Sequence, residues 1–123
     1  MQLLRRTCVF GLACTALAGA VWSRTDAGTA NQVREFAVEG NQFAFSPASI
    51  EVQRDDLVKI RFSARDMAHS FTVDHPYRIA KRASAGQSVV FEFRADQAGR
   101  FRFYCNLSVD ERCRHMQGEL VVR

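Results

Sequence analysis

The chain has 123 residues, which suits one domain, and its ten phenylalanines can supply one hydrophobic core. Its formal net charge is +4, and it falls to +2 when only the residues from Asn31 onward are counted. Charges of opposite sign alternate along that part of the chain without a basic block, which argues against a nucleic-acid-binding protein.

The first twenty residues have the pattern of a signal peptide. MQLLRR is a short basic start, and the apolar run that follows, Thr7 to Trp22, ends in the small residues that a signal peptidase reads. The run has 16 residues, fewer than the roughly 20 that span a bilayer; an uncleaved anchor is the alternative. We expect a signal peptide over residues 1–20, a linker over residues 21–34 and the folded domain over residues 35–123.

Export determines which cysteines matter. Cys8 and Cys14 fall in the predicted signal peptide, where they serve as apolar residues, so only Cys105 and Cys113 remain in the mature protein. We expect that protein to be periplasmic or secreted, with no membrane insertion after cleavage. Its two cysteines would then meet an oxidising compartment, in which disulfides form.

From Asn31 onward, apolar and polar residues alternate in short runs separated by turn residues, which predicts β-strands. The cleanest run places Val58, Ile60 and Phe62 on one face. The stretch from Tyr77 to Ala85 is the least regular, and we expect a loop or a short helical turn there. Seven or eight short strands without a convincing amphipathic helix favour an all-β sandwich of two packed antiparallel sheets.

The last stretch of the chain combines two predicted strands with a loop rich in metal-binding side chains. The loop carries Cys105, Cys113, His115 and Met116, and thiol, imidazole and thioether groups are preferred by soft or borderline metals. His69, directly before the predicted strand that contains Phe71, can supply a further ligand. The loop is therefore a candidate metal site.

Cys113 is flanked by charged residues, and this surrounding is too polar for a thiol of the hydrophobic core. Arg112 and Arg114 are its direct neighbours, and cations near a thiol favour the thiolate. We therefore expect the pKa of Cys113 to be lowered.

Two segments of the chain resemble the cupredoxin family. The first is Phe43-x-Phe45-x-Pro47-x-x-Ile50-x-Val52 with Asp56-x-Val58 and the segment Asp66–Phe71 around His69. The second runs from Phe103-Tyr104-Cys105 to Met116-x-Gly118-x-Leu120 and looks like the copper loop of that family. The resemblance covers roughly residues 35–123 and is closest to secreted single-domain cupredoxins and the copper domain of cytochrome c oxidase subunit II. It implies a cupredoxin-like Greek-key β-sandwich of seven to eight strands, with copper at one end.

The family usually binds copper through one His of the first segment and a Cys, a His and often a Met of the second. His69, Cys105 and Met116 match three of these positions. The subunit II copper domain has its second His three residues before the Met, where this chain has Cys113, and Val109 takes the place of its second bridging Cys. The resemblance therefore implies a copper site that departs from the family's usual ligand set.

The predicted ligands are His69, Cys105, Cys113 and Met116. Other cupredoxins place the second His four or five residues before the Met, where this chain has Arg112 and Glu111. His115 is adjacent to Met116, and neighbours along an extended chain point to opposite faces. Whether His115 or Glu111 contributes a ligand stays open.

Two interpretations remain. In the first, the four residues bind one copper ion, with Cu(I) favoured, and the protein transfers single electrons or handles copper together with a redox or copper-donor protein. In the second, Cys105 and Cys113 form a disulfide that adds roughly 2–3 kcal/mol of stability, and the domain is a metal-free structural or binding module. An enzyme is not expected, because the sequence suggests no nucleophile–base pair and no carboxylate pair for acid–base chemistry.

Overall fold

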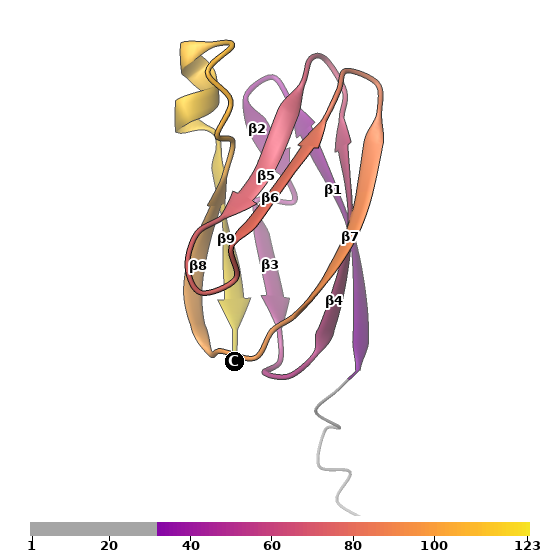
Figure 1. Ribbon diagram of the computed structural model, residues 1–123, viewed down its shortest axis with the longest axis vertical. Helices are drawn as coiled ribbons and strands as arrows, with labels where there is room; N and C mark the ends of the chain where they lie inside the picture. The colour runs from indigo at the N-terminus through magenta and orange to yellow at the C-terminus, as the bar shows by residue number, and fades with distance from the viewer. Residues whose placement is uncertain (1–31) are drawn as a thin grey trace, which may run out of the picture.

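The alternating runs of the sequence form two β-sheets that pack face to face (Figure 1). The computed structural model describes residues 32–123, so the predicted signal peptide and most of the predicted linker lie outside the described residues. The elements in chain order are β1 (Val33–Asn41), β2 (Ala44–Ser46), β3 (Ser49–Val52), β4 (Leu57–Ala64), β5 (His69–Val73), β6 (Ile79–Ala83), β7 (Ser88–Arg94), β8 (Gly99–Tyr104), the 3₁₀ helix η1 (Glu111–His115) and β9 (Gln117–Val122).

The strand order is β2-β1-β4-β7 in one sheet and β3-β9-β8-β5-β6 in the other. This architecture confirms the predicted cupredoxin-like β-sandwich, with nine strands among residues 32–123. Not every pair is antiparallel as we expected: β1 runs parallel to β4, and β3 runs parallel to β9. The reason is that the chain crosses to the second sheet at β3 before it returns as β4, so β1 and β4 are not joined by a hairpin.

The strand that the sequence pattern missed is β6, which lies at the edge of the second sheet. Its buried residues, Ile79 and Ala83, are separated by three exposed ones, so the apolar–polar alternation of a strand is absent. Pairing with β5 through five residue pairs holds the segment in the sheet instead.

Aromatic side chains fill the space between the sheets. The rings of Phe71 and Phe103 stack with their centroids 4.7 Å apart, and Phe45 meets Phe103 edge-on at 5.0 Å. Val58, Ile60 and Phe62 are fully buried beside them, as their alternation predicts. A close-packed core fixes the ends of the strands, and these ends carry the candidate ligands.

The start of β5, the end of β8 and η1 gather at one end of the sandwich, and η1 is drawn in yellow at the top of Figure 1. The first strand starts at the opposite end, at Val33, two residues before the expected start of the domain. Within residues 32–123, no helix is long and apolar enough to cross a membrane.

Candidate metal centre

A buried group of three metal-binding side chains lies at the η1 end of the sandwich. A ring nitrogen of His69 and the sulfur atoms of Cys105 and Cys113 all lie within 4.8 Å of one another. None of the three residues is more than 2% exposed. Residues separated by up to 44 positions therefore converge on one small volume without contact with solvent.

Hydrogen bonds between neighbouring residues hold His69 and Cys105 together. The Ser70 hydroxyl donates to the Asn106 side-chain oxygen at 2.7 Å and accepts from the Asn106 backbone N–H at 2.8 Å. Ser70 follows His69 at the start of β5, and Asn106 follows Cys105 at the end of β8. This reciprocal pair fixes the two ends of the strands, and with them the imidazole and the first thiol.

The second thiol is placed by η1. Asp110 caps this short helix by accepting a hydrogen bond from the Arg112 backbone N–H at 2.9 Å. Side chains three residues apart eclipse each other in a 3₁₀ helix, so Cys113 and Met116, which follows the helix as its C-cap, face the same side. Both are fully buried, and the Cys105 backbone N–H donates to the Met116 carbonyl oxygen at 3.2 Å.

The 3₁₀ geometry also decides the role of the other residues of the loop. His115 and Glu111 are exposed, and His115 faces away from the buried Met116, as the sequence pattern suggested. Val109, in the place of a second bridging cysteine, is 62% exposed. The structure therefore brings His69, Cys105 and Cys113 together and leaves His115 and Glu111 at the surface.

Met116 lies beside His69 because β1 contributes a glycine at that point. A methyl group placed on Gly40 would lie 3.0 Å from the Met116 methyl carbon and 3.2 Å from Cβ and Cδ2 of His69. Both side chains therefore pack against the bare backbone of Gly40. The sequence analysis missed this residue, because a glycine near the end of a predicted strand is read as part of a turn.

The two ring nitrogens of His69 have different surroundings. Its Nε2 atom lies 2.7 Å from the Asp66 carboxylate, whereas its Nδ1 atom is buried without a hydrogen-bond partner. A carboxylate on one nitrogen makes that nitrogen the donor and leaves the lone pair on the other, which is the usual preparation of a histidine that binds a metal. An unpaired polar atom in the protein interior is costly, so a ligand for Nδ1 fits this site.

Asp66 is held in place by more than the histidine. Its second carboxylate oxygen accepts a hydrogen bond from the Gln42 backbone N–H at 3.0 Å. Burial would raise the pKa of Asp66, but the hydrogen bonds from His69 and from backbone N–H groups outweigh it and hold that pKa below its ordinary value. The carboxylate therefore stays charged at neutral pH and keeps the orientation of the imidazole. Asp66 was part of the quoted sequence motif, but its role was not predicted.

Cys105 and Cys113 are both free thiols. Burial and a hydrogen bond with Cys105 raise the pKa of Cys113 to about 12. The expectation of a lowered pKa is therefore wrong, because the thiol points into the protein while the arginine charges remain outside. The Arg112 guanidinium pairs with the Asp110 carboxylate at 2.8 Å and, by its hydrogen bonds, lowers the pKa of Asp110 to about 2.

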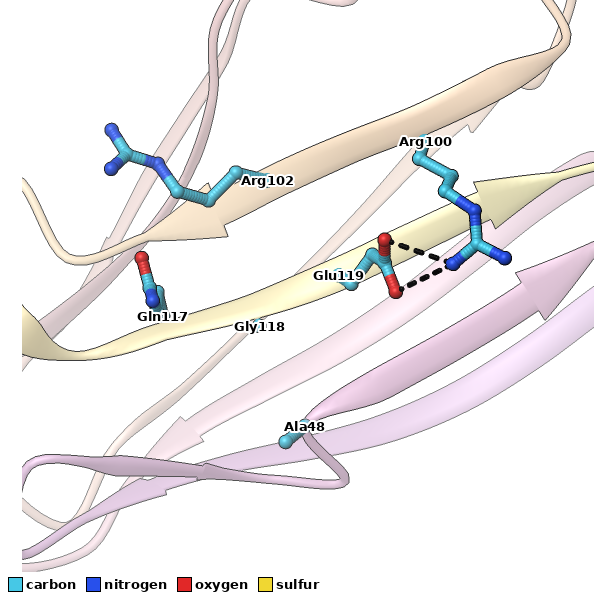
Figure 2. A pocket seen from close by; sticks show the side chains of 6 residues that line it. All are labelled: Ala48, Arg100, Arg102, Gln117, Gly118 and Glu119. Atoms are coloured by element: carbon cyan, nitrogen blue, oxygen red, sulfur yellow. Dashed lines mark hydrogen bonds and ion pairs between the residues drawn. The ribbon is translucent and has the colours of Figure 1, made fainter.

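Two hollows lie near this end of the second sheet. Figure 2 shows the first, on the outer face of β8 and β9, where Arg100 reaches across to both oxygens of Glu119 at 3.2 Å. Its lining contains none of the candidate ligands. The second hollow, of about 330 Å³, has Cys105 in its wall, between the exposed residues Arg102 and Arg114. The surface thus approaches the candidate site most closely at the Cys105 backbone in this hollow.

Comparison with known proteins agrees with this geometry. The sequence matches the family model of the cupredoxin-like domain over residues 13–122. No curated protein matches it.

Three solved structures share the fold. A chain of a heme-copper terminal oxidase dimer superposes with a TM-score of 0.68 and 16% identity, over 95% of this chain and 78% of that one. Auracyanin A, a blue copper protein from Chloroflexus aurantiacus, gives 0.64 and 20% identity, over 74% of this chain and 99% of its own. The periplasmic domain of cytochrome oxidase subunit II from Bradyrhizobium japonicum gives 0.64 and 13% identity, over 72% and 83%.

Proposed function

Because this chain belongs to the family of cupredoxin-like domains, we propose that it binds one copper ion through His69, Cys105, Cys113 and Met116. The observation that supports this proposal best is the buried Nδ1 atom of His69, which has no hydrogen-bond partner in a group that includes two free thiols. A bound metal would satisfy this nitrogen and replace the thiol protons. Copper would supply one-electron chemistry, and the protein would supply a dry, preformed set of ligands.

The chemistry of the four side chains favours the reduced ion. Two thiolates, an imidazole and a thioether form a soft set that stabilises Cu(I) over Cu(II). Zinc accepts thiolate and imidazole ligands but seldom methionine. Cys113, in place of the family's second histidine, is therefore the residue that shifts this site towards Cu(I).

We infer that the protein works in the cell envelope as an electron carrier or a copper-handling protein, not as an enzyme. The predicted signal peptide supports export, and one structural neighbour is itself a periplasmic domain. Burial of all four ligands suits the transfer of an electron or an ion to a protein partner, because a small substrate would need open access to the metal. The partner would be a redox protein or a copper donor.

The alternative function keeps the fold and removes the metal. The side chains of Cys105 and Cys113 are close enough to hydrogen-bond, so oxidation in the envelope could join them without a large movement of η1. The protein would then be a structural or binding module. The state of the two thiols in exported protein separates this function from the first.

The test is a titration of reduced protein with Cu(I) in the absence of oxygen, with metal analysis and a thiol count of the same sample. We expect one copper per chain, no binding by Cys105→Ser and much weaker binding by Cys113→Ser. His115→Ala is the matched control, because His115 is in the same loop but exposed, and it should bind like the wild type. If reduced protein binds no copper and Cys113→Ser changes only thermal stability, the metal-free module is correct.

A further inference from the structure

The turn between β1 and β2 has an unfavourable backbone conformation beside the candidate metal centre. Its two central residues, Gln42 and Phe43, have φ angles of +49° and +63°. Two-residue hairpin turns with both angles positive favour Asn-Gly, because asparagine and glycine adopt the left-handed conformation at little cost. A bulky aromatic residue in that conformation is an outlier. Such strain persists only where the surrounding structure enforces it.

Contacts with the centre enforce this turn. The Gln42 backbone N–H donates to the same Asp66 carboxylate that holds Nε2 of His69. The half-buried Phe43 ring meets the His69 imidazole edge-on, with the ring centroids 6.0 Å apart and an interplanar angle of 88°. The turn therefore contacts both His69 and the carboxylate that orients it.

The other face of Phe43 is covered by η1. The Arg112 guanidinium lies 4.2 Å from the centroid of the Phe43 ring, and two hydrogen bonds, of 3.0 Å and 2.8 Å, bind Arg112 to the Asp110 carboxylate. Asp110 and Arg112 belong to the loop that carries Cys113. The ring is thus held between His69 of one ligand segment and an arginine of the other.

We propose that Phe43 is a positioning residue that covers the His69–Cys113 side of the centre, and that the strained turn exists to hold it there. Removing the ring would free the turn from η1 and allow η1 to open more often. A favourable aromatic contact and a cation–π contact would be lost together, and both resist that opening. The two buried thiols would then meet external reagents more often.

The test measures the rate at which the two thiols of reduced, metal-free protein react with 5,5′-dithiobis(2-nitrobenzoate), together with the melting temperature. The variant that replaces Gln42→Asn and Phe43→Gly should react about tenfold faster, because the two ring contacts that hold η1 are lost. Its melting temperature should not fall, because Asn-Gly relieves the backbone strain. A residue with only a packing role would lower the melting temperature instead.

Three further variants separate the ring from the strain. Phe43→Leu keeps the turn sequence otherwise and should also react faster, whereas Phe43→Tyr retains the ring and should react like the wild type. Asp55→Gly relieves another left-handed residue, with a φ of +70°, in the turn between β3 and β4 at the other end of the sandwich. It should leave the thiol reaction unchanged. Wild-type thiol rates in both ring-free variants would overturn the proposal, as would equal acceleration by Asp55→Gly.

A copper measurement extends the same test and rests on the proposed function. Transfer of Cu(I) from loaded protein to bathocuproine disulfonate should accelerate in the two ring-free variants and stay unchanged in Phe43→Tyr. The thiol reaction needs no metal, so it decides the role of Phe43 even if the protein binds no copper. Faster thiol reaction without copper binding would refute the proposed function alone. Loaded variants that release copper at the wild-type rate would refute the control of metal access by Phe43.

Discussion

The contact between Asp66 and His69 is the interaction outside the four ligands that most directly orients one of them. Asp66→Ala should remove the acceptor of Nε2 and lower the affinity for Cu(I) by roughly 10–100-fold, the usual effect of losing such a partner. Asp66→Asn keeps an acceptor oxygen and should lose less. Competition with a chelator of known affinity measures both, and ¹⁵N spectra of the His69 ring report its tautomer. Unchanged affinity and tautomer in Asp66→Ala would show that the imidazole is oriented by packing alone.

The raised pKa of Cys113 predicts how copper binding depends on pH. A thiol with a pKa of about 12 is protonated throughout the neutral range, so copper must displace that proton when it binds the sulfur. The affinity for Cu(I) should therefore rise with pH, by about tenfold per pH unit for each proton displaced, between pH 6 and pH 8. Chelator competition at several pH values measures this slope. Cys113→Ser should have a slope smaller by one proton, and an equal slope would exclude Cys113 as a ligand.

The same residue shows where reasoning from sequence reached its limit. The candidate ligands His69, Cys105, Cys113 and Met116 could be chosen from residue type and order, because these decide which side chains suit a soft metal. The pKa of Cys113 could not, because it depends on the direction of the side chain. Its charged sequence neighbours, Arg112 and Arg114, lie on the outside of η1 while the thiol is fully buried.

At the scale of elements, regular alternation was sufficient for most strands and insufficient for two segments. β4 alternates at every position, and its burial follows the pattern. β6 has no alternation, and it is a strand because the edge of β5 offers hydrogen bonds. η1 was expected to be a loop, although Asp110 before Glu111 is a recognisable N-cap. Five residues are too few for a helical hydrophobic pattern to be visible.

Close packing between β8 and β9 makes a second prediction at this scale. A methyl group on Gly118 would lie 2.2 Å from two ring carbons of Phe103 and 2.7 Å from the Ala48 carbonyl oxygen. Gly118→Ala should therefore destabilise the domain by about 1–3 kcal/mol, the usual cost of overpacking. It should also disturb the centre, because Phe103 precedes Cys105 by two residues on β8. Urea unfolding measures the loss of stability, and Gln117→Ala, at the adjacent exposed position, is the control. Equal midpoints for the two variants would contradict the packing argument.

At the scale of the whole molecule, the centre joins segments that are far apart in the chain. His69 begins β5, Cys105 follows β8, and Cys113 and Met116 belong to the segment that leads into β9. These strands are neighbours within one sheet, while Gly40 and the turn after β1 come from the other sheet. A metal bound here would link the final third of the chain to its middle and close the η1 end of the sandwich. The unfolded chain has no such arrangement, so binding favours the folded state.

This linkage predicts the effect of copper on global stability. With free Cu(I) at 100 times its dissociation constant, the folded state gains about 2.7 kcal/mol. For a domain of this size, that gain corresponds to a rise in melting temperature of roughly 10–20 °C. Calorimetry of reduced protein with and without one equivalent of Cu(I), buffered by a chelator, tests the prediction. Cys105→Ser should show no rise, because its cluster has lost the sulfur that ends β8, whereas His115→Ala should show the full rise. If Cys105→Ser gained as much stability as the wild type, copper would be bound at another place in the molecule.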